Sequence, residues 1–154
     1  MTVPSLQIVP SESPSSAEPE IDGFWVEPQN VMRLAPLMIP HIERAVARSN
    51  GEVRTGHILD AAERGEFFLS VATEGKDKIV AVCGSEFVFY PTGRKLLRVS
   101  LLGGNGMRRW IHLMKRVEEF ARKNGCHAVQ VTGRKGWGRV VSYPEVRRIF
   151  EKEL

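Results

Sequence analysis

The sequence lacks several features that would place it in a specialised class of protein. No apolar run among its 154 residues approaches the roughly 20 residues that span a bilayer. Its first residues show no basic segment followed by an apolar one, so no secretory signal is expected. Only two cysteines are present, Cys83 and Cys126, and neither lies in a CxxC or CxxH spacing. These absences favour a cytoplasmic protein with reduced, buried thiols.

Signatures of metal binding, hydrolysis and nucleic-acid recognition are missing as well. The four histidines, at 41, 57, 112 and 127, share no metal-ligand spacing, and no metal is expected. No serine or cysteine lies in the pattern of a hydrolase nucleophile. The sequence contains no RNP, KH or zinc-finger pattern. A basic surface on this chain would therefore support only nonspecific binding of nucleic acid.

Basic residues are plentiful but unevenly distributed. The stretch from Pro91 to Arg139 holds twelve Lys or Arg and two Glu, a net charge of +10, whereas the rest of the chain has a net charge of −6. Such an imbalance favours an acidic or phosphate-bearing partner on the basic 91–139 face. A solvated helix face beside a basic loop explains the same pattern.

Residues 1–22 form an acidic segment with four prolines, five serines and no Lys or Arg. This composition buries too little apolar surface to offset the entropy lost on ordering. We therefore expect a disordered tail at 1–22, followed by one domain at 23–154. Two interactions are open to the tail: a partner protein, or the basic half of its own domain.

Apolar periodicity and turn signals predict an α/β protein. Strands are expected at 23–27, 67–72, 79–90, 96–102, 128–132 and 147–154, helices at 31–49, 57–64 and 107–124, and a loop or short helix at 133–139. Antiparallel hairpins combined with one crossover predict a mixed, largely antiparallel sheet of about six strands with helices on both faces.

The turn before the longest expected helix is rich in glycine. A loop of this kind can bind an anion on free backbone N–H groups, and arginines beside it can add charge-assisted hydrogen bonds. The candidate binding residues are Leu102, Gly103, Gly104, Asn105, Gly106, Arg108 and Arg109. Alternatively, the loop is a tight turn in which the glycines only permit a positive φ.

This order of elements, with a glycine loop before a long helix, resembles the GNAT fold of the Gcn5-related N-acetyltransferases over residues 24–154. The resemblance implies acetyl-CoA as cofactor, with its pyrophosphate on backbone amides of the loop, and an amine as acyl acceptor. The family's signature falls between Gly104 and Trp110, where Arg108 and Trp110 occupy the places of two small residues. Because large side chains hinder close approach of a phosphate to the backbone, the loop is interpreted as degenerate.

A second resemblance concerns the segments 98–110 and 133–154. They are similar to small GNAT-like proteins encoded by tailed bacteriophages, some of which are virion proteins. This resemblance implies a phage-encoded protein that is incorporated into a virion.

Acyl transfer to an amine needs a base for the nucleophile and an acid for the leaving thiolate. Glu86 is the nearest candidate base, although an outward-facing strand carboxylate is the simpler interpretation. Tyr143 lies where the resemblance implies a thiolate-protonating tyrosine, but the following Pro144 also suits a turn. Trp137, flanked by glycines and cations, either stacks on a base or anchors its loop.

Three functions follow from these observations. The first is a non-catalytic GNAT-fold binding or assembly module that contacts a protein through the basic 91–139 face or the acidic tail. The second is an active acetyl-CoA-dependent N-acetyltransferase that uses Glu86 and Tyr143. The third, supported by charge alone, is a nonspecific nucleic-acid-binding accessory protein.

Overall fold

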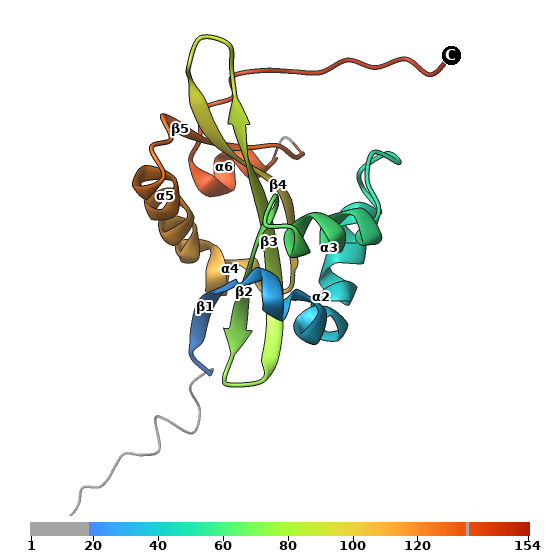
Figure 1. Ribbon diagram of the computed structural model, residues 1–154, viewed down its shortest axis with the longest axis vertical. Coiled ribbons are helices and arrows are strands. Elements are labelled where there is room, and N and C mark those ends of the chain that lie inside the picture. The colour runs from blue at the N-terminus through green and yellow to red at the C-terminus, as the bar shows by residue number, and fades with distance from the viewer. Residues whose placement is uncertain (1–18, 135) are drawn as a thin grey trace, which may run out of the picture.

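The computed structural model describes residues 19–134 and 136–154. Within them, one sheet has its strands in the order β1–β2–β3–β4–β5 (Figure 1). The strands are β1 (Ile21–Val26), β2 (Phe68–Glu74), β3 (Lys78–Phe89), β4 (Lys95–Gly104) and β5 (Ala128–Val131). The first four pair antiparallel and β5 runs parallel to β4, which confirms the predicted α/β class with a mixed, largely antiparallel sheet.

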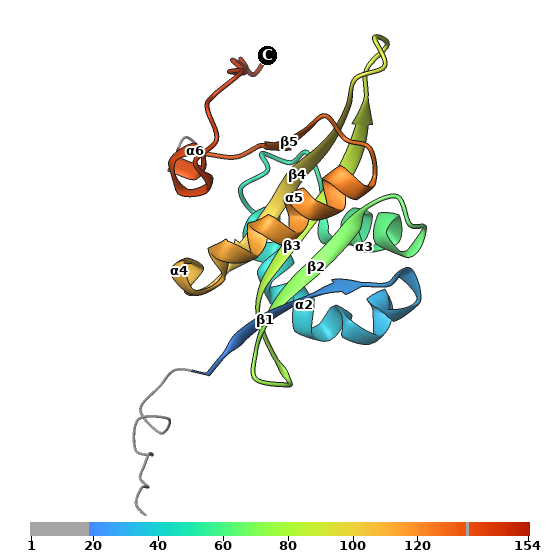
Figure 2. The same ribbon diagram turned by 90° about the vertical axis from the view of Figure 1, so that its left-hand side faces the viewer.

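Helices cover both faces of this sheet, as predicted. Figures 1 and 2 show α2 and α3 on one face and α5 on the other. The helical elements are η2 (Pro28–Asn30), α2 (Val31–Val46), α3 (Thr55–Glu63), α4 (Met107–Trp110), η3 (Ile111–Leu113), α5 (Met114–Lys123) and α6 (Gly136–Val141). In the part of the chain that the structure describes, none of these helices combines the length and apolarity needed to cross a bilayer.

Helix α2 forms despite two internal prolines. Proline removes a backbone donor and crowds the preceding turn, which weakens a helix. Here Pro36 and Pro40 are tolerated because one side of the helix is buried against the sheet. That side consists of Val31, Ala35, Met38 and Ile42, at helical spacing. Tertiary packing therefore outweighs local propensity, and the helix ends three residues before the expected end at residue 49.

The single helix expected at 107–124 is instead divided. Helix α4 ends at Trp110, the 3-10 turn η3 follows, and α5 begins at Met114. The division falls at Trp110, whose indole Nε1–H donates to the Asn105 carbonyl at 2.7 Å. The apolar spacing is still correct, because Trp110, Met114, Val117 and Ala121 are all buried. The prediction identified the buried side but missed the local rearrangement.

The strand expected at 147–154 is wrong. Residues after Val141 form neither helix nor strand, so the described residues give a sheet of five strands rather than about six. A strand needs a neighbour for its backbone hydrogen bonds and cross-strand side-chain pairs. None of the described strands supplies one to this segment.

At the other end, β1 begins at Ile21, two residues earlier than the expected strand. Most of the expected acidic tail, residues 1–18, lies outside the described residues.

The two faces of the sheet are packed differently. The α2/α3 face carries one large buried cluster: Val31, Ala35, Met38, Ile42, Ile58, Leu59, Ala62, Phe67, Leu69, Val71, Val82 and Leu101. The α5 face carries two smaller ones: Leu97, Val99, Met114, Val117 and Ala121, and then Ala72, Val80, Ala81 and Trp110. The candidate loop joins β4 to α4 and so lies where the two faces meet.

Candidate functional site

β4 and β5 pair over a short distance and then diverge. Their register runs from Leu96 with Ala128 to Val99 with Val131. β4 then continues to Gly104 without β5. Opposite β3, β4 also carries one extra residue, Ser100, because the register shifts there. Because the pairing with β5 ends at Val99, the edge of β4 that faces β5 is unpaired from Ser100 onward among the described strands.

Close packing explains two of the loop glycines. A Cβ at Gly103 would lie 2.4 Å from the carbonyl oxygen of His41 in α2, and one at Gly104 would lie 2.5 Å from the Cβ of Ala81. Among the glycines between 103 and 106, only Gly106 has a positive φ, of 64°. Positive φ therefore accounts for Gly106, while the other two let α2 and β3 approach β4 closely.

The polar groups of Asn105, in the middle of the loop, are hydrogen-bonded within the domain. The Asn105 N–H donates to Val80 O at 2.9 Å, and Asn105 Oδ1 accepts from Arg44 Nη1 at 2.7 Å. The Asn105 carbonyl accepts the indole N–H of Trp110. These three bonds fix the shape of the loop and occupy one of the amides that an anion would need.

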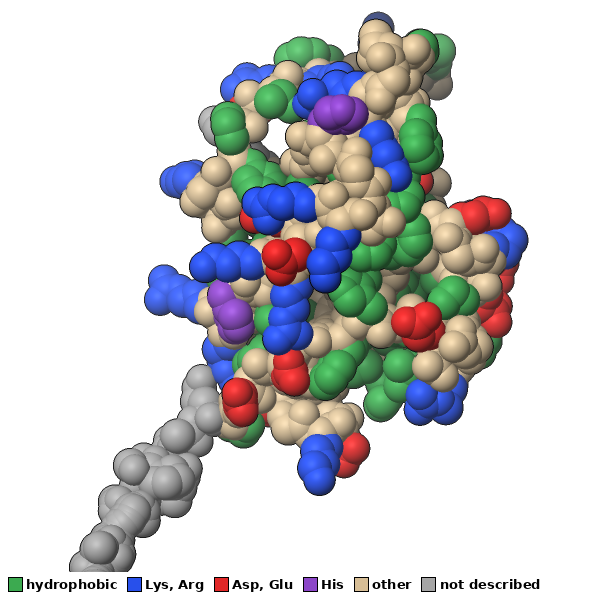
Figure 3. All heavy atoms as spheres, turned by 60° about the vertical axis from the view of Figure 1, so that its left-hand side comes forward, with side chains coloured by type: hydrophobic (Ala, Val, Ile, Leu, Met, Phe, Trp, Pro, Cys, Tyr) green, Lys and Arg blue, Asp and Glu red, His purple; other side chains and the backbone are tan. Residues whose placement is uncertain are grey.

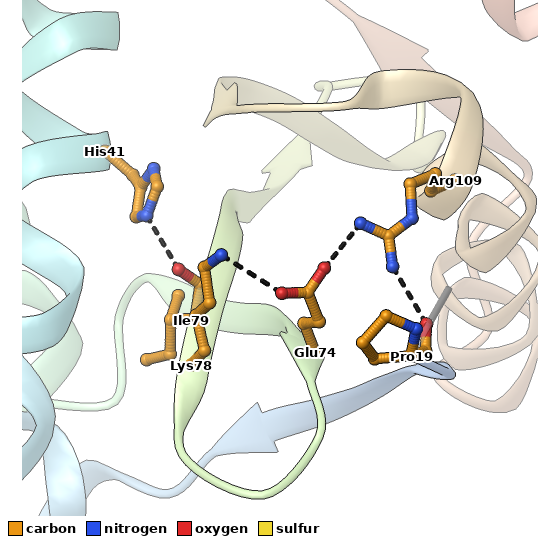
Figure 4. Close-up of polar contacts among 6 residues, drawn as sticks. All are labelled: Pro19, His41, Glu74, Lys78, Ile79 and Arg109. Carbon is orange, nitrogen blue, oxygen red and sulfur yellow. Dashed lines mark hydrogen bonds and ion pairs between the residues drawn. The ribbon is translucent and has the colours of Figure 1, made fainter. Parts of the chain in front are cut away.

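The two arginines of the candidate site have different surroundings. Arg109 turns toward the β2–β3 hairpin, where its Nη1 donates to Glu74 Oε2 at 2.5 Å and its Nη2 donates to Pro19 O at 2.8 Å (Figure 4). Glu74 also accepts from Lys78 Nζ at 3.0 Å. The bonds from Arg109 and Lys78 hold the pKa of the Glu74 carboxyl below its usual value. Arg108, by contrast, is exposed.

The structure places the two candidate catalytic residues on opposite faces of the sheet. Phe87 stacks on Phe120 of α5, with ring centroids 6.0 Å apart, so the preceding residue, Glu86, faces the α2/α3 side. Tyr143 is on the α5 side, where its hydroxyl donates to Glu118 Oε2 at 2.6 Å. Burial and this carboxylate raise the pKa of Tyr143 well above its usual value.

Glu86 has polar neighbours that sequence reasoning missed. Arg98 lies opposite it on β4, and Arg98 Nε donates to Gln130 Oε1 on β5 at 2.7 Å. Arg98 Nη2 lies 3.4 Å from the hydroxyl of Tyr90. These residues come together through strand pairing across long stretches of sequence, and no local motif indicates it.

Tyr143 borders a groove between α5 and β5 of about 300 Å³. Its lining residues are Glu118, Ala121, Arg122, Cys126, His127, Ala128, Val129 and Tyr143. Although three of these residue types ligate metals, no metal-binding group of His, Cys, Asp or Glu is found within residues 19–134 and 136–154.

A smaller cavity of about 90 Å³ lies between the sheet and the helices α4 and α5. Trp110, Met114 and Val117 line its helix side, and Cys83 lines its sheet side. Burial raises the pKa of the Cys83 thiol to about 11, which leaves it protonated and unreactive at neutral pH.

Trp137 belongs to the structure of its loop. It packs against the cluster around Trp110, and a Cβ at Gly133 would lie 2.8 Å from its Cδ1. These contacts favour the anchoring role over stacking on a ligand.

Exposed basic side chains follow α4 and α5. Figure 3 shows Lys, Arg and His side chains gathered over this part of the surface, with acidic ones between them. The exposed basic residues along these helices are Arg108, His112, Lys115, Arg116, Arg122 and Lys123. Arg116 also pairs with Asp22 at 3.2 Å, so Asp22, near the start of β1, lies against this surface.

Comparison with known proteins bears on the fold. No protein-family model and no curated protein sequence matches the chain. Among solved structures, the aminoglycoside acetyltransferase meta-AAC0020 from an uncultured soil metagenomic sample is 18% identical with a TM-score of 0.66; the match covers 87% of this chain and 96% of that one. A second aminoglycoside acetyltransferase from an uncultured soil metagenomic sample, HMB0005, is 16% identical with a TM-score of 0.65. That match covers 88% of this chain and 99% of the other.

A GNAT family acetyltransferase of Staphylococcus aureus is 14% identical, with a TM-score of 0.59, over 88% of this chain and 99% of that one. At sequence identities this low, structural similarity shows a shared fold and nothing about activity. The chain therefore has the fold of the GNAT acetyltransferases.

Proposed function

We propose that this chain is a GNAT-fold binding or assembly module that does not transfer acyl groups. The observation that carries the proposal is the state of the loop at residues 102–109. A loop that binds a pyrophosphate must offer free backbone N–H groups and mobile positive charge. Here the Asn105 N–H is bonded to Val80 and the Arg109 guanidinium to Glu74 and Pro19, so Arg108 is the one exposed arginine of the two in this loop.

The side chain of Trp110 supports the same interpretation. It is buried, and its indole is bonded to the loop backbone at Asn105. By the resemblance, a small residue belongs at this position so that phosphate can approach the backbone. The burial and the hydrogen bond hold both the ring and the loop backbone in place.

The separation of the candidate catalytic residues is a second, independent support. A base and an acid that serve one reacting centre must both reach it within hydrogen-bond distance. Glu86 and Tyr143 lie on opposite faces of the sheet, and the Tyr143 hydroxyl is already bonded to Glu118.

The binding partner is proposed from charge. An acidic protein suits the exposed basic residues along α4 and α5. The acidic segment before β1 is the alternative contact. Incorporation into a bacteriophage virion rests on the sequence resemblance alone and stays a prediction.

Thermal denaturation with acetyl-CoA tests the proposal. A ligand present at 100 times its Kd stabilises a folded protein by about 2.7 kcal/mol, a shift of several degrees for a domain of this size. We expect no shift in Tm with millimolar acetyl-CoA or desulfo-CoA. A shift that Arg108→Ala abolishes and Lys115→Ala preserves would contradict the proposal, because Lys115 lies on the same surface but outside the loop.

An active N-acetyltransferase is the second candidate, favoured by the unpaired edge of β4 where β5 diverges. An extended ligand can add to such an edge through main-chain hydrogen bonds. The similar enzyme meta-AAC0020 is known in complex with sisomicin. Release of free thiol from acetyl-CoA in the presence of sisomicin, lost in Glu86→Gln, would establish this candidate in place of the first.

A further inference from the structure

The cavity of about 90 Å³ beneath α4 and α5 lies over a group of small side chains on the sheet. Gly23 on β1 pairs with Ala72 on β2, and Ala72 pairs with Ala81 on β3, so the three lie side by side on one face. Ser70 and Cys83 form the next cross-strand pair on that face. Because these side chains are short, the helices in front of them in Figure 2 leave a gap, and all five residues line the cavity.

Solvent reaches this cavity from one side. Cys83 lies on β3, the middle strand of the sheet, and packs against the α5 cluster, yet it is partly exposed, as is Ser70 on β2. The exposed surface of both residues therefore faces the cavity. Of the described residues that line it, only Phe24 and Arg116 belong to the exposed class, so they mark its mouth, between β1 and α5.

The walls of the cavity favour an apolar occupant. Their described polar side chains are few: Ser70 and Cys83 face each other across β2 and β3, and the Trp110 indole N–H is bonded to Asn105. A water molecule in a cavity needs two to four polar partners, whereas an apolar cavity of about 150 Å³ stays dry and binds benzene. By that scale, a cavity of about 90 Å³ holds a chain of about four carbon atoms.

Arg116 gives the mouth a positive charge. It is the only charged residue among the described residues that line the cavity. Its Nη1 donates to the Gly23 carbonyl at 2.6 Å, which holds the guanidinium at the mouth, and its Nη2 lies 3.2 Å from Asp22 Oδ1. Both side chains of this ion pair are more than half exposed, so the pair contributes little. A ligand carboxylate can take the place of Asp22, because guanidinium groups bind carboxylates through two parallel hydrogen bonds.

We propose that this cavity is a binding site for a short-chain carboxylate, with the alkyl chain between the sheet and α5 and the carboxylate on Arg116. The site goes beyond the assembly function proposed above. Arg116 lies outside the loop at 102–109, so binding of a carboxylate here and binding of acetyl-CoA at the loop can be tested separately.

NMR of the full chain, labelled with ¹³C in its methionine methyl groups, tests the proposal. Met114 lines the cavity, whereas Met38 is buried in the α2/α3 cluster and is an internal control. We expect pentanoate to shift the Met114 signal saturably and to leave the Met38 signal in place. Each CH₂ added between acetate and pentanoate should tighten binding about fourfold, and heptanoate should bind no more tightly than pentanoate. No saturable shift, or equal affinity for acetate and pentanoate, would overturn the proposal.

The charge of the ligand tests the role of the mouth. Butylammonium presents the same four carbons with the opposite charge, and it should not shift the Met114 signal at concentrations where pentanoate saturates. Arg116→Gln should weaken pentanoate binding about tenfold. The matched control is Lys115→Gln, an exposed cation next in sequence that does not line the cavity, and it should bind as the wild type does. Equal binding of the two ions, or equal losses in the two variants, would overturn the assignment to Arg116.

A third variant fills the cavity without changing its mouth. Ala72→Val adds two carbon atoms to the floor, where there is space for them, and valine suits a strand. The variant should keep the circular dichroism of the wild type and bind pentanoate about fifteenfold more weakly. The matched control, Ala128→Val on β5, should bind normally. Unchanged binding in Ala72→Val would place the ligand elsewhere and overturn the proposal.

Discussion

The two faces of the sheet differ in how tightly they are packed. On the α2/α3 face, helix and sheet approach so closely that a Cβ at Gly103 would overlap the backbone of α2. On the α5 face, a cavity of about 90 Å³ and a groove of about 300 Å³ separate the helices from parts of the sheet. The first face is the more tightly packed, and the second has open space and exposed charge.

This contrast separates the contacts that hold the fold together from those of the loop at residues 102–109. The contacts that fix the sheet depend on the α2/α3 cluster and on the glycines at the end of β4. Changes at Arg108 and Trp110 leave those contacts in place. A chain can therefore keep the architecture while the loop takes on other hydrogen bonds.

Truncating one methionine on each face gives the largest expected effects. Met38 is fully buried in the α2/α3 cluster, whereas Met114 borders the cavity. Truncating a buried methionine to alanine costs about 2–5 kcal/mol, depending on how well the site collapses. We expect Met38→Ala near the upper end of that range, near 4 kcal/mol, and Met114→Ala near its lower end, about 2 kcal/mol. Urea denaturation measures both.

Lys115→Ala, exposed and adjacent to Met114, should change the free energy of unfolding by no more than about 0.5 kcal/mol. Equal costs for the two methionine substitutions would show that the faces are packed alike.

Adding one methyl group at Gly103 should come next. The Cβ would lie 2.4 Å from the His41 carbonyl, so α2 must move away from β4. Overpacking of this kind costs about 1–3 kcal/mol. Thermal or urea unfolding of Gly103→Ala measures this cost. A neutral result would mean that α2 is not held tightly on β4.

Gly56→Ala is the matched control. Gly56 is in α3, and no atom lies within 4 Å of its added Cβ. Because alanine restricts the unfolded chain more than glycine does, this change should stabilise the domain by about 0.4–1 kcal/mol.

The sequence predicts much of this architecture because the relevant signals are local. The spacing of Trp110, Met114 and Val117 identifies the buried side of α5, and the turn signals place the strands within a few residues. The strand at 147–154 failed because pairing depends on a distant neighbour.

The candidate loop shows a second limit of prediction from sequence. Its glycines are visible in the sequence, but their reasons are not: the approach of His41 to Gly103 is set by the packing of α2. The bond between Arg109 and Glu74 joins residues 35 positions apart, and no motif marks it.

The bond between Tyr143 and Glu118 should have a smaller effect. Removing the hydroxyl in Tyr143→Phe deletes one hydrogen bond to a carboxylate, at a cost of about 1 kcal/mol at neutral pH. Burial and the nearby carboxylate raise the pKa of Tyr143 in the folded state above its ordinary value of 10. A raised pKa adds stability below the ordinary value, and this stability is lost as pH rises through the folded-state value.

Urea denaturation between neutral and strongly alkaline pH measures this dependence. The difference between wild type and Tyr143→Phe should shrink above pH 10, the ordinary value for tyrosine. A difference independent of pH would mean that the hydroxyl is solvated rather than bonded.

Glu74→Gln should have the smallest effect on stability, and that effect should disappear in acid. Hydrogen bonds from Arg109 and Lys78 lower the pKa of the Glu74 carboxyl in the folded state. A lowered pKa adds stability above the ordinary value of 4.5, and this stability is lost as pH falls through the folded-state value. The wild type should therefore exceed Glu74→Gln in Tm at neutral pH and lose that advantage in acid.

Glu66→Gln is the matched control for this comparison. Glu66 pairs with Arg64 at an exposed site, where an ion pair contributes little, so this variant should follow the wild type at every pH. Glu74→Gln also weakens the bond that turns Arg109 away from the loop. If acetyl-CoA raised the Tm of Glu74→Gln but not of the wild type, this one bond, rather than the bulk of Trp110, would be what closes the loop to a pyrophosphate.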